Sequence, residues 1–488
     1  MSFPFIGRTR QSWHGSRSRA FGSRAVARVV HEERASRSYA LPRFRIALFA
    51  IVATSPLLSA QGVSSAAVSD RHTARPHRTA DSLTLRVLFD AVDRANPRAR
   101  AALLLARAAE ARVAGTTRPP DPELQLGLMN YSLPRLAPDA ALGMRQLQLM
   151  QMVPLPGKLA AAGDAARARA DAARLRADDT RWDGRTQAAM SFYDAWAAAE
   201  RARLARETRR LLEQIAAVAN AMYKVGDGRQ GDVLRARVAI ATMDEDVARM
   251  EAMQEAMRGR LVALTDLSRD ALAAPFAEPT LPDAIPSLDA MLQLADAGRP
   301  MLAAGAADVR AASANTRLAR RERWPDVKLG LQYGERSMDG GTDRMGSVMI
   351  GASLPVFARD RQLRMRDEAA AMQAMAQADL DAMRAETRAR VIERHAELAS
   401  ARRLLALYRQ SIIPQAEAAA ESALASYRSG AVDFMTVLDN RMTVNRYLAE
   451  VATLRANEGK AWAELEMLAG RPLTDTAPLP PTREGARQ

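Results

Sequence analysis

The sequence predicts a mainly α-helical fold with a β-barrel portion, built as a tandem α-β-β-α repeat. Three observations support this prediction. Several landmarks recur 201 to 204 residues apart, which indicates a duplicated unit. Two long stretches, 158–224 and 360–428, have the Ala-, Arg- and Leu-rich composition of helices. Four short segments alternate between apolar and polar residues, which is typical of strands with two different faces.

The duplication is clearest at a turn of the pattern Tyr-x-x-Gly, followed by Val-Leu. The first copy contains Tyr223, Gly226, Val233 and Leu234, and the second contains Tyr427, Gly430, Val437 and Leu438, at an offset of 204. Asn96-Pro97 likewise corresponds to Arg299-Pro300 at an offset of 203, and Pro154 corresponds to Pro355 at 201. A nearly constant offset through separate landmarks indicates two copies of one unit.

The composition excludes several classes of protein. Cysteine is absent from these 488 residues, so the sequence offers no disulfide, no thiolate metal site and no acylated cysteine. The net charge of +14 is concentrated in the N-terminal part. Residues 1–45 contain ten Arg against two Glu and residues 46–80 contain three Arg against one Asp, so only +4 remains from Asp81 onward. A nucleic-acid site would place this charge on the folded domain, so no nucleic-acid partner is expected.

The N-terminal part has the pattern of a secretion signal. Arg43 and Arg45 precede the apolar run Ile46–Leu58, and small residues follow it. A run of about a dozen apolar residues is too short to span a bilayer but has the length of a signal-peptide core. No other stretch is long and apolar enough for a transmembrane helix, so we expect an exported protein whose membrane span consists of strands.

These features divide the chain into six segments. They are an N-terminal extension with a signal peptide (1–60), a flexible linker (61–80), the first repeat (81–274), an inter-repeat linker (275–287), the second repeat (288–470) and a disordered tail (471–488). The inter-repeat linker is defined by four prolines within a short stretch, which interrupt helix.

Within the first repeat, a helical pattern begins near residue 81, restarts at Pro97 and ends near Gly115. Two alternating runs, 124–128 and 146–153, predict a hairpin of strands. The stretch 158–224 lacks proline and predicts one helix of about 100 Å, at 1.5 Å per residue. Glycines then break the chain before a returning helix over 232–267.

The second repeat predicts the same order of elements. A helix over 288–323 is interrupted near Pro300, and strands follow over 327–333 and 348–354, joined by a turn at Gly340-Gly341. A second helix of about 100 Å is expected over 360–428, with a kink at Pro414. The last helix runs over 433–468.

The alternation assigns two faces to the four strands. The apolar face, expected to contact lipid, includes Leu126, Leu149, Leu329 and Ile350. The polar face, expected to line a lumen, includes Gln146, Gln148, Lys328 and Gln332. Strands of about ten residues with such faces are typical of outer-membrane barrels. Four strands cannot close a barrel, and open edges are not tolerated in lipid, so several copies are expected to share one barrel.

The order and spacing of these motifs resemble the TolC family of outer-membrane efflux proteins. The resemblance extends from Asp81 to about Gly470 and rests on Ala95-Asn96-Pro97, Pro154-Leu155-Pro156-Gly157-Lys158, Leu354-Pro355-Val356-Phe357 and the two Tyr-x-x-Gly turns. It implies a homotrimer with a shared twelve-stranded barrel in the outer membrane and an α-helical tunnel through the periplasm. It also implies a channel that works with a periplasmic adaptor (membrane fusion) protein and an inner-membrane pump, exporting heavy-metal ions or drugs.

The resemblance further implies a role for the two turns, which form the periplasmic tip in that family. The residues expected to dock the adaptor are Tyr223, Gly226, Val233, Leu234, Tyr427, Gly430, Val437 and Leu438. In the family an Asp-Val-Leu-Asp stretch lines the periplasmic constriction. This chain has Thr436 and Asp439 at the two acidic positions, and Asp232 of the first repeat aligns with Thr436.

These three residues are therefore the expected periplasmic gate. Threefold symmetry would place three Asp439 side chains around one axis, and such a ring selects cations. An alternative remains open from the sequence. Asp439 would then only stabilise the first turns of its helix, or pair with Arg235 or Arg441.

Two other classes of function were weighed. For an enzyme, the sequence has no Gly-rich phosphate loop, no G-x-S-x-G and no H-E-x-x-H. His395 is the only histidine of the predicted folded part, and a lone helical histidine is usually structural, so we expect no catalytic residue and no cofactor. A periplasmic coiled-coil adaptor or scaffold would also have long helical hairpins, but it would not need alternating strands in both repeats.

The 23 methionines raise the question of metal binding, because thioethers are ligands for Cu(I). Three sets share a face: Met144, Met150 and Met152 on a strand, Met250, Met253 and Met257 on one helix, and Met365, Met372 and Met375 on another. Methionine also packs helices adaptably, and this is the favoured explanation for the helical sets. The strand set is the better candidate if it faces the lumen, but the sequence alone assigns no metal site.

Overall fold

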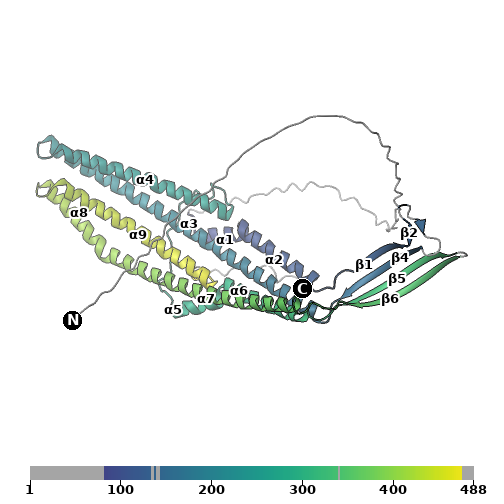
Figure 1. Cartoon of the computed structure of the whole chain (residues 1–488). Coiled ribbons are helices and arrows are strands. Elements are labelled where there is room, and N and C mark those ends of the chain that lie inside the picture. The colour runs from purple at the N-terminus through teal and green to yellow at the C-terminus, as the bar shows by residue number, and fades with distance from the viewer. Residues whose placement is uncertain (1–81, 133, 135–136, 139–142, 339–340, 475–488) are drawn as a thin grey trace, which may run out of the picture. The chain divides into compact units, whose positions relative to one another are not determined.

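The computed structural model of the chain describes residues 82–132, 134, 137–138, 143–338 and 341–474. The expected leader, the linker 61–80, Gly340 and the tail after residue 474 lie outside the described residues. In chain order the elements are α1 (Leu85–Ala95), α2 (Pro97–Thr116), β1 (Glu123–Met129), β2 (Tyr131–Ser132), β3 (Ala137–Pro138), β4 (Met144–Val153), α3 (Lys158–Lys224), α4 (Gln230–Thr265), α5 (Leu288–Gly298), α6 (Pro300–Arg321), β5 (Val327–Met338), β6 (Gly341–Ala352), α7 (Gln362–Leu407), the π-helix η1 (Tyr408–Ile412), α8 (Ile413–Arg428) and α9 (Phe434–Ala469) (Figure 1).

Each repeat begins with a helix that breaks before a proline. Asn96 separates α1 from α2 with an extended backbone (φ −60°, ψ 116°), and its side chain accepts hydrogen bonds from the backbone N–H groups of Arg98 and Ala99. Arg299 separates α5 from α6 with nearly the same backbone angles (φ −68°, ψ 117°). A residue before proline avoids the helical region, and proline is tolerated in a first turn, so both breaks have the same physical cause.

The prediction of two very long helices is confirmed, with one refinement. α3 is continuous over 67 residues, or about 100 Å at 1.5 Å per residue. Its counterpart is interrupted by the π-helix η1 immediately before Pro414. Pro414 has no N–H to donate, and its ring crowds the carbonyl one turn earlier, so the helix widens there into a π turn.

The long helices approach closely because small residues lie between them. The buried face of α3 is mostly alanine, and α3 packs against α4, α6 and α9. Gly459 of α9 shows how tight this packing is, because a methyl group added there would lie 2.2 Å from Cε1 of Tyr193 in α3. The Tyr193 ring therefore lies directly on the backbone of α9, and a larger residue at position 459 would force the two helices apart.

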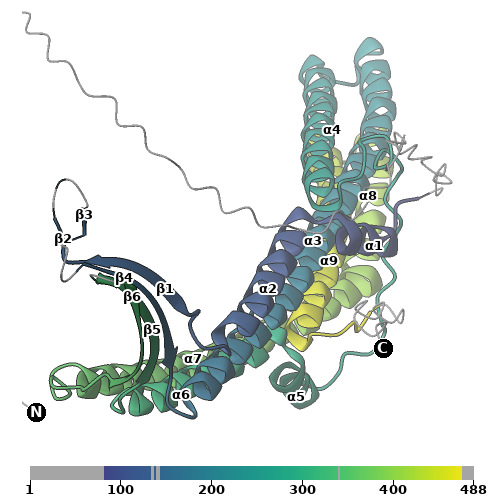
Figure 2. The ribbon, with the colours of Figure 1, turned by 90° about the vertical axis from the view of Figure 1, so that its right-hand side faces the viewer.

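The four long strands form one antiparallel sheet in the order β1-β4-β5-β6 (Figure 1), and this sheet is curved (Figure 2). The two repeats are joined by the pairing of β4 with β5, in which Leu149 lies opposite Leu331. β1 and β6 are the outer strands and have one unpaired edge each in this chain. The connection from β1 to β4 contains the two-residue strands β2 and β3, which pair with each other.

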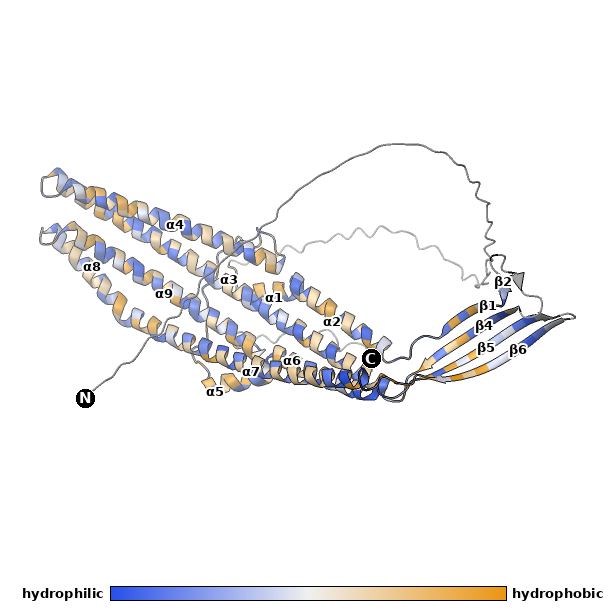
Figure 3. Cartoon of the chain, in the orientation of Figure 1, coloured by the Kyte–Doolittle hydropathy of each residue, from blue (hydrophilic) through white to orange (hydrophobic). Residues whose placement is uncertain are grey.

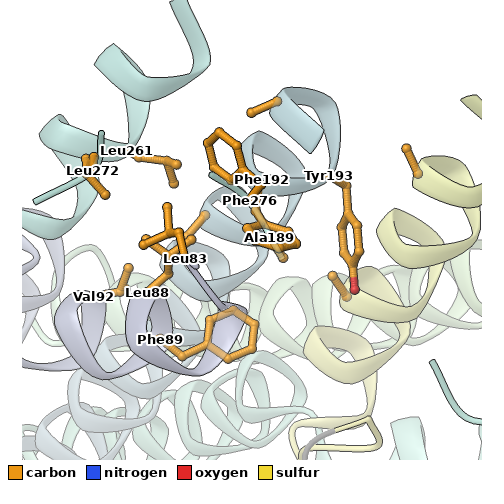
Figure 4. Close-up of a cluster of buried hydrophobic side chains, with 14 of the residues drawn as sticks. Leu83, Leu88, Phe89, Val92, Ala189, Phe192, Tyr193, Leu261, Leu272 and Phe276 are labelled. Carbon is orange, nitrogen blue, oxygen red and sulfur yellow. The ribbon is translucent and has the colours of Figure 1, made fainter. Parts of the chain in front are cut away.

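Three larger clusters of buried side chains, and a small one around Met250, hold the described helices together. The first joins α1, α3, α4 and the linker around Leu88, Phe192 and Phe276 (Figure 4), where the Phe192 ring meets Tyr193 and Phe276 edge-on at 5.5 Å. The second lies at the end of the long helices that is opposite to the sheet, where α3, α4, α8 and α9 meet. The third packs Trp462 of α9 against α5 and α7.

A buried ionic cluster fixes the linker between the repeats. Glu458 of α9 is 2% exposed and accepts hydrogen bonds from Arg402 Nε at 2.8 Å and from Arg455 Nη1 at 3.0 Å. Arg455 also donates to the carbonyl of Pro279 at 3.0 Å, and Arg402 donates to the carbonyls of Pro282 and Asp283. One carboxylate thus organises two guanidinium groups that bind the linker backbone.

Candidate functional site

The two Tyr-x-x-Gly segments form equivalent turns at the end of the long helices that is opposite to the sheet (Figure 1). Gly226 and Gly430 both have a left-handed backbone, with φ of +87° and +73°. In each turn the glycine N–H donates to the carbonyl of the tyrosine three residues earlier, at 3.2 Å in the first repeat and 3.0 Å in the second. The sequence repeat is therefore also a repeat of backbone conformation, and glycine is required at both positions.

We expect Gly430→Ala to weaken the second turn by about 1–2 kcal/mol, because a side chain in the left-handed region is strained. No atom lies within 4 Å of the added methyl group, so the cost is conformational and not steric. The measurement is hydrogen exchange of the amides at 428–434. Gly231→Ala is the matched control, because Gly231 also has open space around it but no positive φ. Equal exchange in the two variants would contradict the requirement for glycine.

The tip, defined as the two turns 223–234 and 427–438, shares one hydrophobic core contributed by α3, α4, α8 and α9. Tyr427 and Phe434 meet at a ring distance of 5.6 Å, and both are buried together with Val437. Val233 and Leu438 are partly buried against the same core. Tyr427, Phe434 and Val437 therefore support the tip from inside, whereas Val233 and Leu438 keep part of their surface exposed.

The exposed apolar side chains of the tip come from the first repeat and from the start of α9. Tyr223 is 45% exposed and Leu234 is 52% exposed, whereas Tyr427, the counterpart of Tyr223, is 5% exposed. Val225 and Met435 are also exposed, and the sequence comparison of the repeats missed them because neither belongs to the shared motif. The two turns have the same backbone conformation but different neighbours. Contacts between the two repeats determine that Tyr427 is buried and Tyr223 is exposed.

The three residues of the predicted gate lie in different environments. Asp232 is nearly buried, with its Oδ1 3.8 Å from Nη1 of Arg235. Thr436 donates from its backbone N–H to Asp433 Oδ1 at 3.0 Å, so Asp433 caps α9. Asp439 is exposed and has no ion pair among the described residues, so the expected alternative of pairing with Arg235 or Arg441 is not observed within this chain.

The electrostatics of the tip follow from these contacts. Burial raises the pKa of the Tyr427 hydroxyl, and the charge of Asp232 adds to this effect. Hydrogen bonds from Thr436 lower the pKa of Asp433, which stays ionised as the cap of α9. The Tyr427 hydroxyl is buried without a hydrogen-bond partner in the described part of the chain. Asp439 is thus the one predicted gate residue that carries an exposed side chain with no charged partner among the described residues.

The register of the sheet places the predicted strand residues on two faces. Leu126, Leu149, Leu329 and Ile350 share one face of the sheet. Leu329 lies directly opposite Ile350, and the rows of paired residues through Leu149 and Leu126 are an even number of residues away along the strands, where side chains point to the same side. Gln146, Gln148, Lys328 and Gln332 share the other face, where Gln332 Nε2 donates to Gln146 Oε1 at 2.7 Å. Figure 3 shows apolar and polar residues alternating along these strands.

Among the remaining candidates of the sequence, His395 and Met250 make structural contacts. His395 Nε2 lies 3.0 Å from the carbonyl oxygen of Pro286, which ties α7 to the start of the second repeat. Met250 is buried against Ala198 and Ala202, as expected for a packing residue. Met365, Met372 and Met375 are exposed on α7. Within the described ranges, no three His, Asp or Glu side chains gather as a metal site.

Sequence reasoning missed the Glu458 cluster, because its three side chains and three carbonyls come from distant parts of the chain. The sequence signal for this cluster was a charged residue among apolar ones in α9.

Another buried carboxylate, Asp93, accepts hydrogen bonds from Arg181 Nε at 2.9 Å and from Arg185 Nε at 3.1 Å. Burial opposes the charge of Asp93, but hydrogen bonds from both guanidinium groups outweigh it and lower the pKa.

The sheet has one mainly aliphatic face and two unpaired edges, and it adjoins two helical runs of about 100 Å, α3 and α7-η1-α8, which both lead from the sheet to the tip. This is the arrangement expected of one subunit of a mixed α/β tube. Among the described helices, none has both the length and the apolarity of a bilayer span. Comparisons with known proteins agree with this class. The family model described as outer membrane efflux protein matches residues 291–471, which include nearly all of the second repeat.

Individual relatives cover more of the chain. The cobalt-zinc-cadmium resistance protein CzcC of Cupriavidus metallidurans is 25% identical over 324 residues, or 64% of this chain and 75% of that protein. A membrane protein from Pseudomonas aeruginosa has a similar structure, with a TM-score of 0.70 at 20% identity over 80% of this chain and 90% of that chain. The outer-membrane channel OprN gives 0.68 at 20% identity, over 79% and 89%. These comparisons confirm the resemblance to the TolC family of outer membrane efflux proteins that the sequence indicated.

Proposed function

We propose that this chain is the outer-membrane channel of a tripartite efflux system, with three copies forming one conduit from a periplasmic adaptor and an inner-membrane pump to the exterior. The single observation that carries this proposal is the sheet, which has an aliphatic face, a polar face and two open edges. Unpaired strand edges are too costly in lipid to remain open, so β1 of one copy is expected to pair with β6 of the next.

The alternative of a periplasmic adaptor or scaffold does not explain this sheet. An adaptor would have no use for exposed Leu126, Leu331 and Ile350 on one face of four long strands, at 81%, 58% and 76% exposure. Such a patch on a water-soluble protein is an aggregation hazard, whereas in lipid it is the expected outer surface of a barrel. Recovery of the chain in the soluble periplasm, and not in the outer membrane, would favour the scaffold.

The opposite end of the chain supports contact with an adaptor. Tyr223, Val225 and Leu234 expose apolar surface at the tip, about 100 Å from the sheet along α3. Buried Tyr427, Phe434 and Val437 hold the turns in place behind them. We propose that the first-repeat turn provides the adaptor contact and that the second-repeat turn supports it.

The proposed gate rests on Asp439. Its carboxylate is exposed and has no ion pair in the described part of the chain, so in a threefold assembly it is free to face the axis. Asp232 and Thr436 are engaged within the chain, the first near Arg235 and the second with Asp433. One acidic ring, contributed by Asp439, is therefore proposed at the periplasmic entrance.

We expect Asp439→Asn to reduce the cation preference of the channel and its block by multivalent cations, because a carboxylate ring attracts cations electrostatically. The measurement is single-channel conductance in planar bilayers with asymmetric salt. Asp379→Asn, at an exposed position on α7 far from the tip, is the matched control. If Asp439→Asn and Asp379→Asn leave selectivity and block equally unchanged, Asp439 has no role in the gate.

The family is one of transport proteins, and we propose a transport role for this chain with no catalytic step of its own. The relative CzcC is named for resistance to cobalt, zinc and cadmium. Heavy-metal ions are accordingly the first class of cargo to test, and drugs are the second. Export of heavy-metal ions and of drugs would be compared in cells that contain the cognate pump, with and without this channel. The class of cargo whose export depends on the channel would be identified in this way.

A further inference from the structure

The methionines of the sheet all lie on the polar face. The strand methionines with described side chains are Met129, Met144, Met150, Met152, Met345 and Met349, and the register places each of them on the face of Gln146, Gln148 and Gln332. We call this surface the thioether face. Every leucine, valine and isoleucine of the described strands lies on the opposite face. Methionine is thus the only large apolar side chain on a surface that is otherwise Gln, Gly, Ser and charged residues.

This sorting is not explained by hydrophobicity. A barrel places apolar side chains toward lipid and polar ones toward the lumen, and methionine would be expected to follow leucine. Methionine differs from leucine in its thioether sulfur, which is a ligand for soft metal ions. Methionine is also unbranched and more flexible than leucine, but only the thioether gives it an atom that can bind a metal ion.

Two glycines of β5 leave bare backbone beside these thioether groups, and one of them borders two methionines. Met150, Gly330 and Met349 lie side by side on β4, β5 and β6. A methyl group added at Gly330 would lie 3.5 Å from Sδ of Met150 and 3.2 Å from Cε of Met349, so both thioether groups border the same bare backbone. At Gly334, the added methyl group would lie 3.0 Å from Sδ of Met144. The thioethers lie along the sheet wall and not out from it.

The row around Gly330 has polar neighbours on the same face. Gln148 Nε2 donates a hydrogen bond to Sδ of Met150 at 2.8 Å, and Glu123 of β1 lies opposite Met150 in the register and adds a carboxylate to the row. The nearest cation on this face is Lys328, which belongs to the next row, opposite Met152. Two thioethers with a carboxylate on the neighbouring strand suit a soft monovalent cation better than a hard divalent one.

We propose that the thioether face binds soft monovalent metal ions of the Cu(I) and Ag(I) class, with Met150 and Met349 as the principal pair. The site rests on the proposed channel only for the expectation that this face lines the lumen. In that setting the face would provide a weak, repeated set of ligands along the conduit, as conduction requires binding that permits both entry and release. Binding itself is a property of the sheet and can be measured separately from transport.

The test is binding of Ag(I), added as silver nitrate in chloride-free buffer, to the purified full chain in detergent. The probe is the NMR signal of [methyl-¹³C]methionine together with calorimetric titration. We expect the signals of Met150 and Met349 to shift first. Since even indirect partners of a metal are worth about 10- to 100-fold in affinity, Met150→Leu with Met349→Leu should lower the affinity of this site by at least about tenfold.

Met372→Leu with Met375→Leu is the matched control, because it removes two exposed methionines from α7 and leaves the sheet intact. Gly330→Ala keeps every sulfur atom, but its added methyl group would occupy the space over the backbone between Met150 and Met349. This variant is therefore also expected to bind Ag(I) more weakly. Equal loss of Ag(I) binding in the sheet and control variants, or no loss in the sheet variant, would overturn the proposal. Channel conductance of the sheet variant is expected to persist, so failure of the metal site and failure of the channel function give different results.

Discussion

Glu458→Ala is expected to lower the stability of the helical part by about 3 kcal/mol, the lower end of the cost of removing one partner from a buried ion pair. The side chain of Glu458 is 3% exposed, and it neutralises Arg402 and Arg455 at once. Without it, two guanidinium groups would face each other in a partly buried site. They keep some contact with water, at 21% and 22% side-chain exposure, which limits the cost.

The measurement is the midpoint of thermal helix loss by circular dichroism, combined with hydrogen exchange in the linker 275–287. The linker should lose protection because both arginines that bind its carbonyls lose their anchor. Glu450→Ala is the matched control, because Glu450 is an exposed glutamate of the same helix. If both variants melt alike and the linker stays protected, the cluster does not fix the linker.

Leu329→Arg is expected to impair insertion and assembly, at a cost of about 2–4 kcal/mol near the middle of the apolar band. Leu329 is 44% exposed in the single chain and lies on the aliphatic face beside Ile350. A charged side chain there would lie in hydrocarbon, whereas the same change on the polar face would lie in water. The amount of folded protein in outer-membrane fractions, judged by resistance to heat in detergent, measures the effect.

Gln332→Arg is the matched control, since Gln332 is on the same strand but on the opposite face. It is expected to assemble normally and to change only conductance. If Leu329→Arg assembles normally while Gln332→Arg does not, the lumen and lipid faces are the reverse of those proposed here.

Much of this architecture could be predicted from the sequence because it depends on local pattern. The alternation around Leu126 and Gln148 fixed the two faces of the strands, and a proline-free stretch predicted α3 with the observed bounds. Pro414 predicted a disturbance of the second long helix, and the structure shows a π turn there. Each of these features follows from residues near one another in the chain.

The features that the sequence did not reveal depend on contacts between distant segments. Tyr223 and Tyr427 occupy the same position in their repeats, yet only Tyr427 is buried, since Phe434 and the neighbouring helices cover it. The methionine set on β4 was visible as a pattern, but its pairing with Met349 across Gly330 required the register of three strands. Repeats predict equivalent backbone, and packing then gives the equivalent residues different roles.

The central claim is that several copies of this chain close one barrel in the outer membrane, and native mass spectrometry of the protein extracted in mild detergent tests it most directly. The account predicts a particle of three chains that survives extraction, because each copy supplies four strands and leaves two edges open. A stable folded monomer, with a mass at or below the 53.1 kDa of the full chain, would contradict it.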